Sequence, residues 1–185
     1  MSGTGSIESI DVIESYVEEV TKNIKLNRPL NISIDCGNGA AGVVAEKVYK
    51  GLDCEVEGLY CDLDGNFPNH HPDPSRPENV EDLIQSVLKN KSDIGLAFDG
   101  DADRLGVISP SGEMIFPDMQ MILFSEHVLK KNPNSKIVFD VKCSKLLEEA
   151  ILKSKGTPIM SKTGHTFIKS MIRDNGAILG GEMSG

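Results

Sequence analysis

Three aspartates at alternate positions are the residues in this sequence best placed to do chemistry. Asp99, Asp101 and Asp103 are separated by single small residues, and an apolar run, residues 94–98, leads into them. Three carboxylates this close repel one another unless a cation lies among them. Carboxylate oxygens suit a hard cation, and Mg²⁺ in proteins is held by carboxylates together with phosphate and water. The spacing therefore predicts a Mg²⁺ site formed by the three aspartates.

Arg104 directly follows these aspartates. Three carboxylates and one Mg²⁺ leave one net negative charge, so the guanidinium is placed to help receive a further anion. An EF-hand begins with the same spacing, but it requires Gly at position six and Glu at position twelve, where this chain has Arg104 and Pro110. A phosphatase with an aspartate nucleophile remains an alternative, since it also places Asp-x-Asp after a strand. A solvated acidic turn is disfavoured by the apolar run that precedes it.

Four segments resemble the α-D-phosphohexomutases, the phosphomannomutase/phosphoglucomutase family. They are similar to the metal loop of that family (99–104), to its sugar-binding loop (181–185) and to two further segments (67–74 and 162–165), and they occur in the same order. The combination is far more specific than any one of the motifs. The resemblance covers nearly all of residues 7–185, but these correspond to only the second domain and most of the third.

The resemblance implies an α/β fold with two consecutive mixed α/β three-layer domains, the second of them truncated. We place the first in residues 7–112, with the metal loop, and the incomplete second in residues 113–185, with the sugar-binding loop. Residues 1–6 are small and polar, and we interpret them as an expression scar.

The resemblance also implies a role for each candidate residue. Asp99, Asp101 and Asp103 would hold Mg²⁺ together with a phosphoserine oxygen from a preceding domain, and Arg104, the catalytic candidate, would lie near the transferring phosphoryl group. Four more side chains are implied to bind the substrate: Lys142, His165, Glu182 and Ser184.

The implied reaction is the reversible transfer of phosphate between O1 and O6 of a hexose, through an enzyme phosphoserine outside this chain and a hexose 1,6-bisphosphate. The implied partners are mannose or glucose phosphates and the serine-loop and phosphate-binding domains of the same polypeptide, so we expect this chain alone to be inactive. A phosphoglucosamine-type mutase and a non-catalytic module that binds Mg²⁺ and sugar phosphate are the alternatives.

The pattern of apolar residues along the chain explains how the candidate site residues could lie close together in the fold. Alternation and apolar runs predict strands that end just before Asp99, Lys142, His165 and Glu182. Ligands bind at the carboxyl ends of strands in open α/β sheets, so we expect the four residues at such an edge. Apolar residues three or four apart predict six helices: 10–24, 40–50, 80–88, 117–129, 146–151 and 167–172.

Residues 37–42 match the G-x-G-x-x-G spacing of a dinucleotide site, and Asp62 follows at a suitable distance. A nicotinamide-dependent oxidoreductase is therefore a competing hypothesis. The spacing alone is weak evidence, and we favour an interpretation in which the glycines allow a tight strand-to-helix turn and close packing.

The composition argues against several other classes of protein. The net charge of −9 argues against nucleic-acid binding, and no apolar run reaches the ~20 residues that span a bilayer. The four cysteines lack C-x-x-C spacing, which argues against a zinc site and favours buried free thiols. With no signal peptide, these features predict a cytoplasmic protein.

Overall fold

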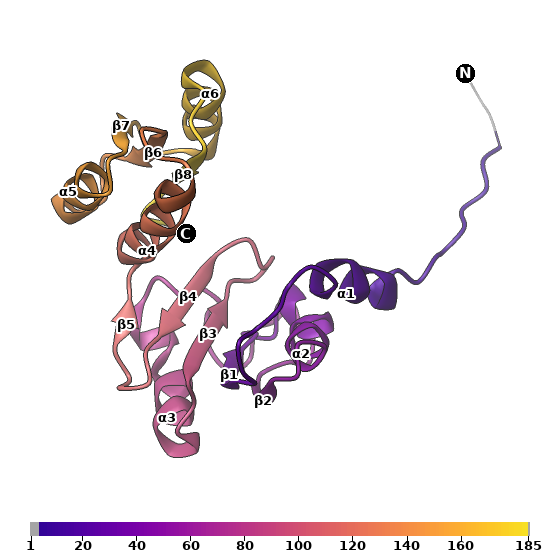
Figure 1. The fold of residues 1–185 in the computed structure, drawn as a ribbon. Helices are drawn as coiled ribbons and strands as arrows, with labels where there is room; N and C mark the ends of the chain where they lie inside the picture. The colour runs from indigo at the N-terminus through magenta and orange to yellow at the C-terminus, as the bar shows by residue number, and fades with distance from the viewer. Residues whose placement is uncertain (1–3, 185) are drawn as a thin grey trace.

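A computed structural model describes residues 4–184, which form two separate β-sheets with helices packed against them (Figure 1). The first sheet contains strands β1 to β5 and the second contains β6 to β8. This arrangement confirms the predicted α/β class. Gly185, the last residue of the sugar-loop motif, and part of the segment interpreted as an expression scar lie outside the described residues.

The first sheet is mixed and has the strand order β2-β1-β3-β4-β5. Strand β1 pairs in parallel with both β2 and β3, whereas β3, β4 and β5 form antiparallel pairs. Strand β2 lies at the edge, as predicted for that segment. The strands are β1 (Asn31–Asp35), β2 (Glu55–Leu59), β3 (Ile94–Phe98), β4 (Leu105–Ile108) and β5 (Met114–Ile115).

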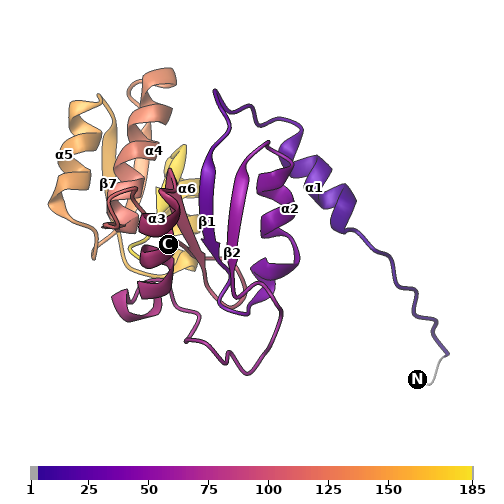
Figure 2. The same cartoon turned by 90° about the horizontal axis from the view of Figure 1, so that it is seen from below.

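Helices cover both faces of this sheet. Helix α3 (Glu81–Asn90) buries Leu83 and Val87 against Ala97 and Ile108. On the other face, the short helices η1 (Ala40–Val43) and α2 (Ala45–Lys50) pack on the first two strands, and α1 (Ile13–Thr21) lies outside α2 (Figure 2). A last short helix, η2 (Pro77–Asn79), precedes α3.

The second sheet is parallel and has the order β7-β6-β8. Its central strand is buried on both faces, with Ile137 and Phe139 packed against α4 and α5. Helix α6 packs on the opposite face, where Ile168 is buried. The elements are α4 (Pro117–Lys131), β6 (Lys136–Asp140), α5 (Lys145–Lys153), β7 (Thr157–Ser161), α6 (His165–Asn175) and β8 (Leu179–Gly181).

Several details differ from the sequence-based expectations. Helix α1 is shorter than predicted and buries no residue, because it rests only against α2. Leu146 and Phe167, expected to face inward, are about half exposed because Leu147 and Ile168 occupy the buried positions of α5 and α6. No helix within residues 4–184 is both long enough and apolar enough to cross a bilayer.

Candidate active site

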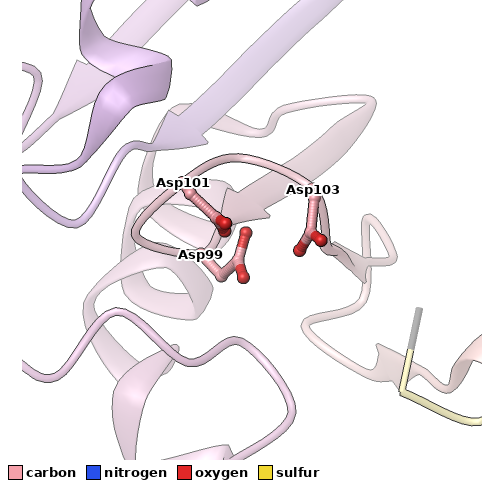
Figure 3. A group of neighbouring side chains, drawn as sticks. All are labelled: Asp99, Asp101 and Asp103. Atoms are coloured by element: carbon pink, nitrogen blue, oxygen red, sulfur yellow. The ribbon is translucent and has the colours of Figure 1, made fainter. Parts of the chain in front are cut away.

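The three predicted metal ligands lie in one loop that joins β3 to β4. Asp99, Asp101 and Asp103 direct their carboxylates toward a common point (Figure 3), and one oxygen from each lies within 4.8 Å of the other two. Asp99 is buried, whereas Asp101 and Asp103 are exposed. The alternation of carboxylates with small residues thus brings all three acidic groups together, as the sequence predicts. Ala102 allows the tight turn by taking a left-handed conformation, with φ of 64°.

This donor set fits Mg²⁺. In an octahedron, oxygens bound to Mg²⁺ at 2.0–2.1 Å lie about 2.9 Å apart when adjacent and about 4.2 Å apart when opposite, so these carboxylates would close inward around the ion. The electrostatic repulsion among the three carboxylates also favours a bound cation. The charges of Asp101 and Asp99 raise the pKa of Asp103 above its ordinary value, and a cation among them would oppose that effect.

Arg104 is held against the metal loop rather than free in solvent. Its Nε donates to Asp99 Oδ2 at 2.7 Å, its backbone N–H donates to Asp99 Oδ1 at 3.0 Å, and its Nη1 donates to Asp73 Oδ1 at 3.1 Å. Burial by itself would raise the pKa of Asp99, but the hydrogen bonds and charge of Arg104 outweigh it and the pKa is lowered. Asp99 is therefore kept as a carboxylate, the form that a metal requires.

The glycine-rich turn after β1 supports the back of this loop. Ala40 N donates to Gly100 O at 3.0 Å, and a Cβ on Gly39 would lie 2.7 Å from that oxygen. A Cβ on Gly42 would lie only 2.0 Å from the carbonyl oxygen of Cys61. Close backbone packing explains why glycine occupies these positions, which confirms the interpretation of residues 37–42 as a packing turn.

The second sheet gathers three of the predicted substrate residues at its carboxyl edge. Lys142 follows β6, His165 begins α6 after β7, and Glu182 follows β8. Because β6 pairs in parallel with both β7 and β8, the loops after the three strands emerge on the same side of the sheet. Lys142 and His165 are exposed and Glu182 is half-buried. The predicted convergence of these residues at strand ends is therefore observed.

Buried acidic groups fix the loops that carry these side chains. Asp140, which is fully buried, accepts hydrogen bonds from Lys142 N at 3.2 Å and from Thr163 Oγ1 at 3.0 Å. Asp118 accepts from Ser144 N at 2.9 Å and so holds the start of α5. Glu182 accepts from the backbone N–H of Gly164, which joins the β8 loop to the residue that precedes His165.

The two sheets meet at the site. A groove of about 330 Å³ is lined by Asp103 of the metal loop and by Glu182 of the second domain, among other residues. The exposed Ser184 lines a small pocket together with Pro74 and Ser75 of the loop before η2 and Gly106 of β4. A Cβ on Gly181 would lie 2.6 Å from Met121 Sδ, so the side chain of Met121 packs directly against the backbone of β8. The metal loop and the loop with Glu182 therefore face one shared space.

Sequence reasoning missed the supporting acids Asp35, Asp73 and Asp140. Asp35 is buried and accepts from His70 Nε2 at 3.0 Å, so His70 holds its loop against the end of β1. Burial raises the pKa of Asp35 above its ordinary value. Asp35 and Asp140 are each the last residue of a buried strand, and an acid ending an apolar run is the signal that could have identified them.

Comparison with known proteins agrees with this geometry. Residues 14–112 match the family described as Phosphoglucomutase/phosphomannomutase, alpha/beta/alpha domain II, and residues 116–185 match alpha/beta/alpha domain III. The chain belongs to the phosphoglucomutase/phosphomannomutase family. The resemblance stated from the sequence motifs is thereby confirmed, and the two sheets correspond to domains II and III of the family.

Relatives within the phosphoglucomutase/phosphomannomutase family are similar over the whole chain. A phosphoglucomutase of Neisseria gonorrhoeae is 52% identical over 98% of this chain and 39% of its own length. A phosphomannomutase/phosphoglucomutase of Pseudomonas aeruginosa is 48% identical over 100% of this chain and 40% of its own length. The crystal structure of a family protein from Burkholderia thailandensis matches 100% of this chain with a TM-score of 0.93 and 49% identity. The chain spans about two fifths of the length of these relatives.

Proposed function

We propose that this chain is part of a phosphomannomutase/phosphoglucomutase that moves phosphate between O1 and O6 of a hexose. The observation that carries the proposal is the shared groove, which Asp103 of the metal loop and Glu182 of the sugar loop line from different sheets. A phosphorylated sugar requires charge neutralisation for its phosphate and hydrogen bonds for its hydroxyls. The two loops offer these two kinds of contact within one space.

In this proposal, residues 7–112 and 113–185 are two domains with separate tasks. The first presents Asp99, Asp101 and Asp103 to Mg²⁺, which when bound would neutralise charge on a phosphoryl group. Arg104 orients Asp99 through two hydrogen bonds and keeps its guanidinium at the edge of the loop. The phosphoserine that donates the phosphoryl group would come from another domain of the same polypeptide.

The second domain binds the sugar. Glu182 and Ser184 supply a carboxylate and a hydroxyl for the hexose hydroxyls, while Lys142 and His165 contact the substrate from the same sheet edge. Phosphate leaves one end of the sugar and returns to the other through a hexose 1,6-bisphosphate that turns over in the site. Because mannose and glucose differ only at C2, both phosphates would fit the same hydroxyl contacts.

The experiment is conversion of mannose 1-phosphate to mannose 6-phosphate, followed by ³¹P NMR. We expect the full-length polypeptide to convert the substrate and the 185-residue chain alone to show no conversion. Full-length Glu182→Gln should have a strongly reduced kcat/KM. Glu149→Gln, at an exposed position of α5, is the matched control and should retain activity. Turnover by the chain alone would refute the assignment of essential groups to other domains. A full-length polypeptide without mutase activity would refute the proposed function itself.

A further inference from the structure

Two cysteine sulfurs lie side by side behind the metal loop. Cys36 directly follows β1 and Cys61 follows β2, and their Sγ atoms are 3.5 Å apart. A disulfide requires about 2.05 Å, so the sulfurs need to approach by about 1.5 Å. Sequence spacing gives no hint of this pair, because the strands β1 and β2 bring together residues that are distant in the chain.

The backbone on both sides of the pair is fixed by hydrogen bonds. Cys36 N donates to Leu59 O at 3.1 Å, and Asn38 N donates to Tyr60 O at 2.8 Å. Tyr60 takes a left-handed conformation, with φ of 53°, as the chain turns into Cys61. The parallel pairing of β1 with β2, continued by these two hydrogen bonds, therefore holds the two sulfurs next to each other.

The other two cysteines have different surroundings. Cys54 Sγ contacts the carbonyl oxygen of Leu52, and Cys143 Sγ contacts Asp140 Oδ1 at 3.2 Å. Within residues 4–184, the close contact between two sulfurs thus belongs to Cys36 and Cys61, which makes Cys54 a matched control on the same sheet.

We propose that Cys36 and Cys61 are a redox modification site that forms a reversible disulfide and thereby alters the metal loop. The oxidant is a small disulfide such as oxidised glutathione. The Cys61 thiolate attacks one of its sulfurs, forms a mixed disulfide and releases one glutathione thiolate. The Cys36 thiol then attacks Cys61 Sγ, and its proton passes to the second glutathione thiolate as that group leaves. Two protein thiols are oxidised, one glutathione disulfide is reduced to two thiols, and no other reactant is needed.

The surroundings assign the attacking role to Cys61. Cys61 is partly exposed, whereas Cys36 is fully buried. The hydrogen bond with Cys36 lowers the pKa of Cys61, and the same contact, followed by burial, raises the pKa of Cys36. A partly exposed thiol with a lowered pKa, beside a buried thiol with a raised pKa, is the arrangement in which one sulfur reacts first and the other resolves the mixed disulfide.

The link to the metal loop is the glycine-rich turn that starts one residue after Cys36. Gly42 packs against the carbonyl oxygen of Cys61, and Ala40 N donates to Gly100 O between Asp99 and Asp101. Drawing the two sulfurs together moves both ends of this turn, and the packing leaves no free space at Gly39 or Gly42 to absorb the movement. The strain therefore reaches the backbone of the metal loop.

The first test is thiol chemistry, which does not depend on the proposed function. The 185-residue chain is incubated with oxidised glutathione, and the remaining thiols are alkylated. The chain is then cleaved after glutamate and the peptides are analysed by mass spectrometry. Cleavage after Glu57 separates Cys54 from Cys61. We expect a crosslink between the Cys36 and Cys61 peptides, formed also in Cys54→Ser and lost in Cys61→Ser. If Cys36 and Cys61 stay alkylatable in a buffer that oxidises a dithiol peptide, the disulfide is refuted.

The second test concerns the effect on the metal loop, which rests on the proposed function. We expect oxidation to weaken Mg²⁺ binding several-fold and to speed hydrogen exchange of the Ala40 amide, with both changes reversed by reduction and absent in Cys61→Ser. A disulfide that leaves both quantities unchanged would refute the coupling. If the reduced chain does not bind Mg²⁺, the proposed metal site fails, while Ala40 exchange still decides whether the disulfide disturbs the loop.

Discussion

The buried carboxylate of Asp140 accepts a hydrogen bond from the hydroxyl of Thr163 at 3.0 Å. The same carboxylate accepts from the backbone N–H of Lys142. One acid at the end of β6 therefore fixes the loop that carries Lys142 and the loop that leads to His165. We therefore interpret Asp140 as a positioning residue, since Lys142 and His165, which we propose to contact the substrate, extend from the loops that it holds.

Replacing Asp140 with Ala should destabilise the chain by about 2–3 kcal/mol, because the Lys142 N–H and the Thr163 hydroxyl lose their buried, charged acceptor. Lys145→Ala, which removes a side chain that is 82% exposed, should change stability by less than about 0.5 kcal/mol. Urea unfolding of both variants measures the difference. Equal stabilities would show that Asp140 does not hold the two loops.

The sequence was most informative where the residues that could do chemistry lie close together in the chain or directly after a predicted strand. The spacing of the three aspartates requires no knowledge of distant contacts, because neighbouring residues in one loop form the cluster. The strand ends before Lys142 and Glu182 follow from apolar runs that must be buried. Local signals of this kind predicted the cluster of three aspartates, the second sheet and the edge at which Lys142, His165 and Glu182 gather.

Relations between distant segments could not be predicted. The ion pair of Arg104 with Asp73 and the contact between Cys36 and Cys61 depend on which strands become neighbours, and no local spacing encodes that choice. The antiparallel pairing of β3 with β4 was likewise not anticipated. Helix α1 was predicted too long because periodicity indicates an apolar face but not whether another element covers it.

Gly42→Ala should destabilise the chain by about 3 kcal/mol, because the new Cβ would lie 2.0 Å from the carbonyl oxygen of Cys61 and backbone must move to relieve the overlap. Gly65 has no neighbour within 4 Å of an added Cβ, so Gly65→Ala is the control and should be nearly neutral. Thermal and urea unfolding give the comparison. A neutral Gly42→Ala would contradict the close packing of this turn.

Replacing Arg104 with Met should lower stability by about 1–2 kcal/mol in the absence of divalent ions, a value reduced by the partial exposure of the guanidinium. Loss of this cation also leaves the metal loop more negative, so Mg²⁺ should stabilise the variant more than the wild type. Melting temperatures with and without Mg²⁺ test both effects. Arg173→Met, at an exposed position, should respond to Mg²⁺ as the wild type does.

The pair of Arg28 with Asp93 gives a prediction about pH. The hydrogen bonds from Arg28 and from Asn31 N lower the pKa of Asp93 to about 2. The stabilising contribution is therefore complete above the ordinary pKa of 3.8 and is lost as the pH falls toward 2.

Carboxyl ¹³C NMR should show Asp93 still charged at about pH 3 in the wild type, while in Arg28→Met its titration should move toward its ordinary value. A titration that is the same in both proteins would mean that Arg28 does not hold the carboxylate.

The central claim is that Asp99, Asp101 and Asp103 together bind Mg²⁺, and calorimetric titration of the chain with MgCl₂ tests it most directly. We predict one saturable site whose affinity falls by at least about tenfold in Asp101→Asn, since the site loses one of its three charged ligands. Asp62→Asn, in an exposed loop outside the cluster, should bind as the wild type does. Unchanged Mg²⁺ affinity in Asp101→Asn would contradict the account.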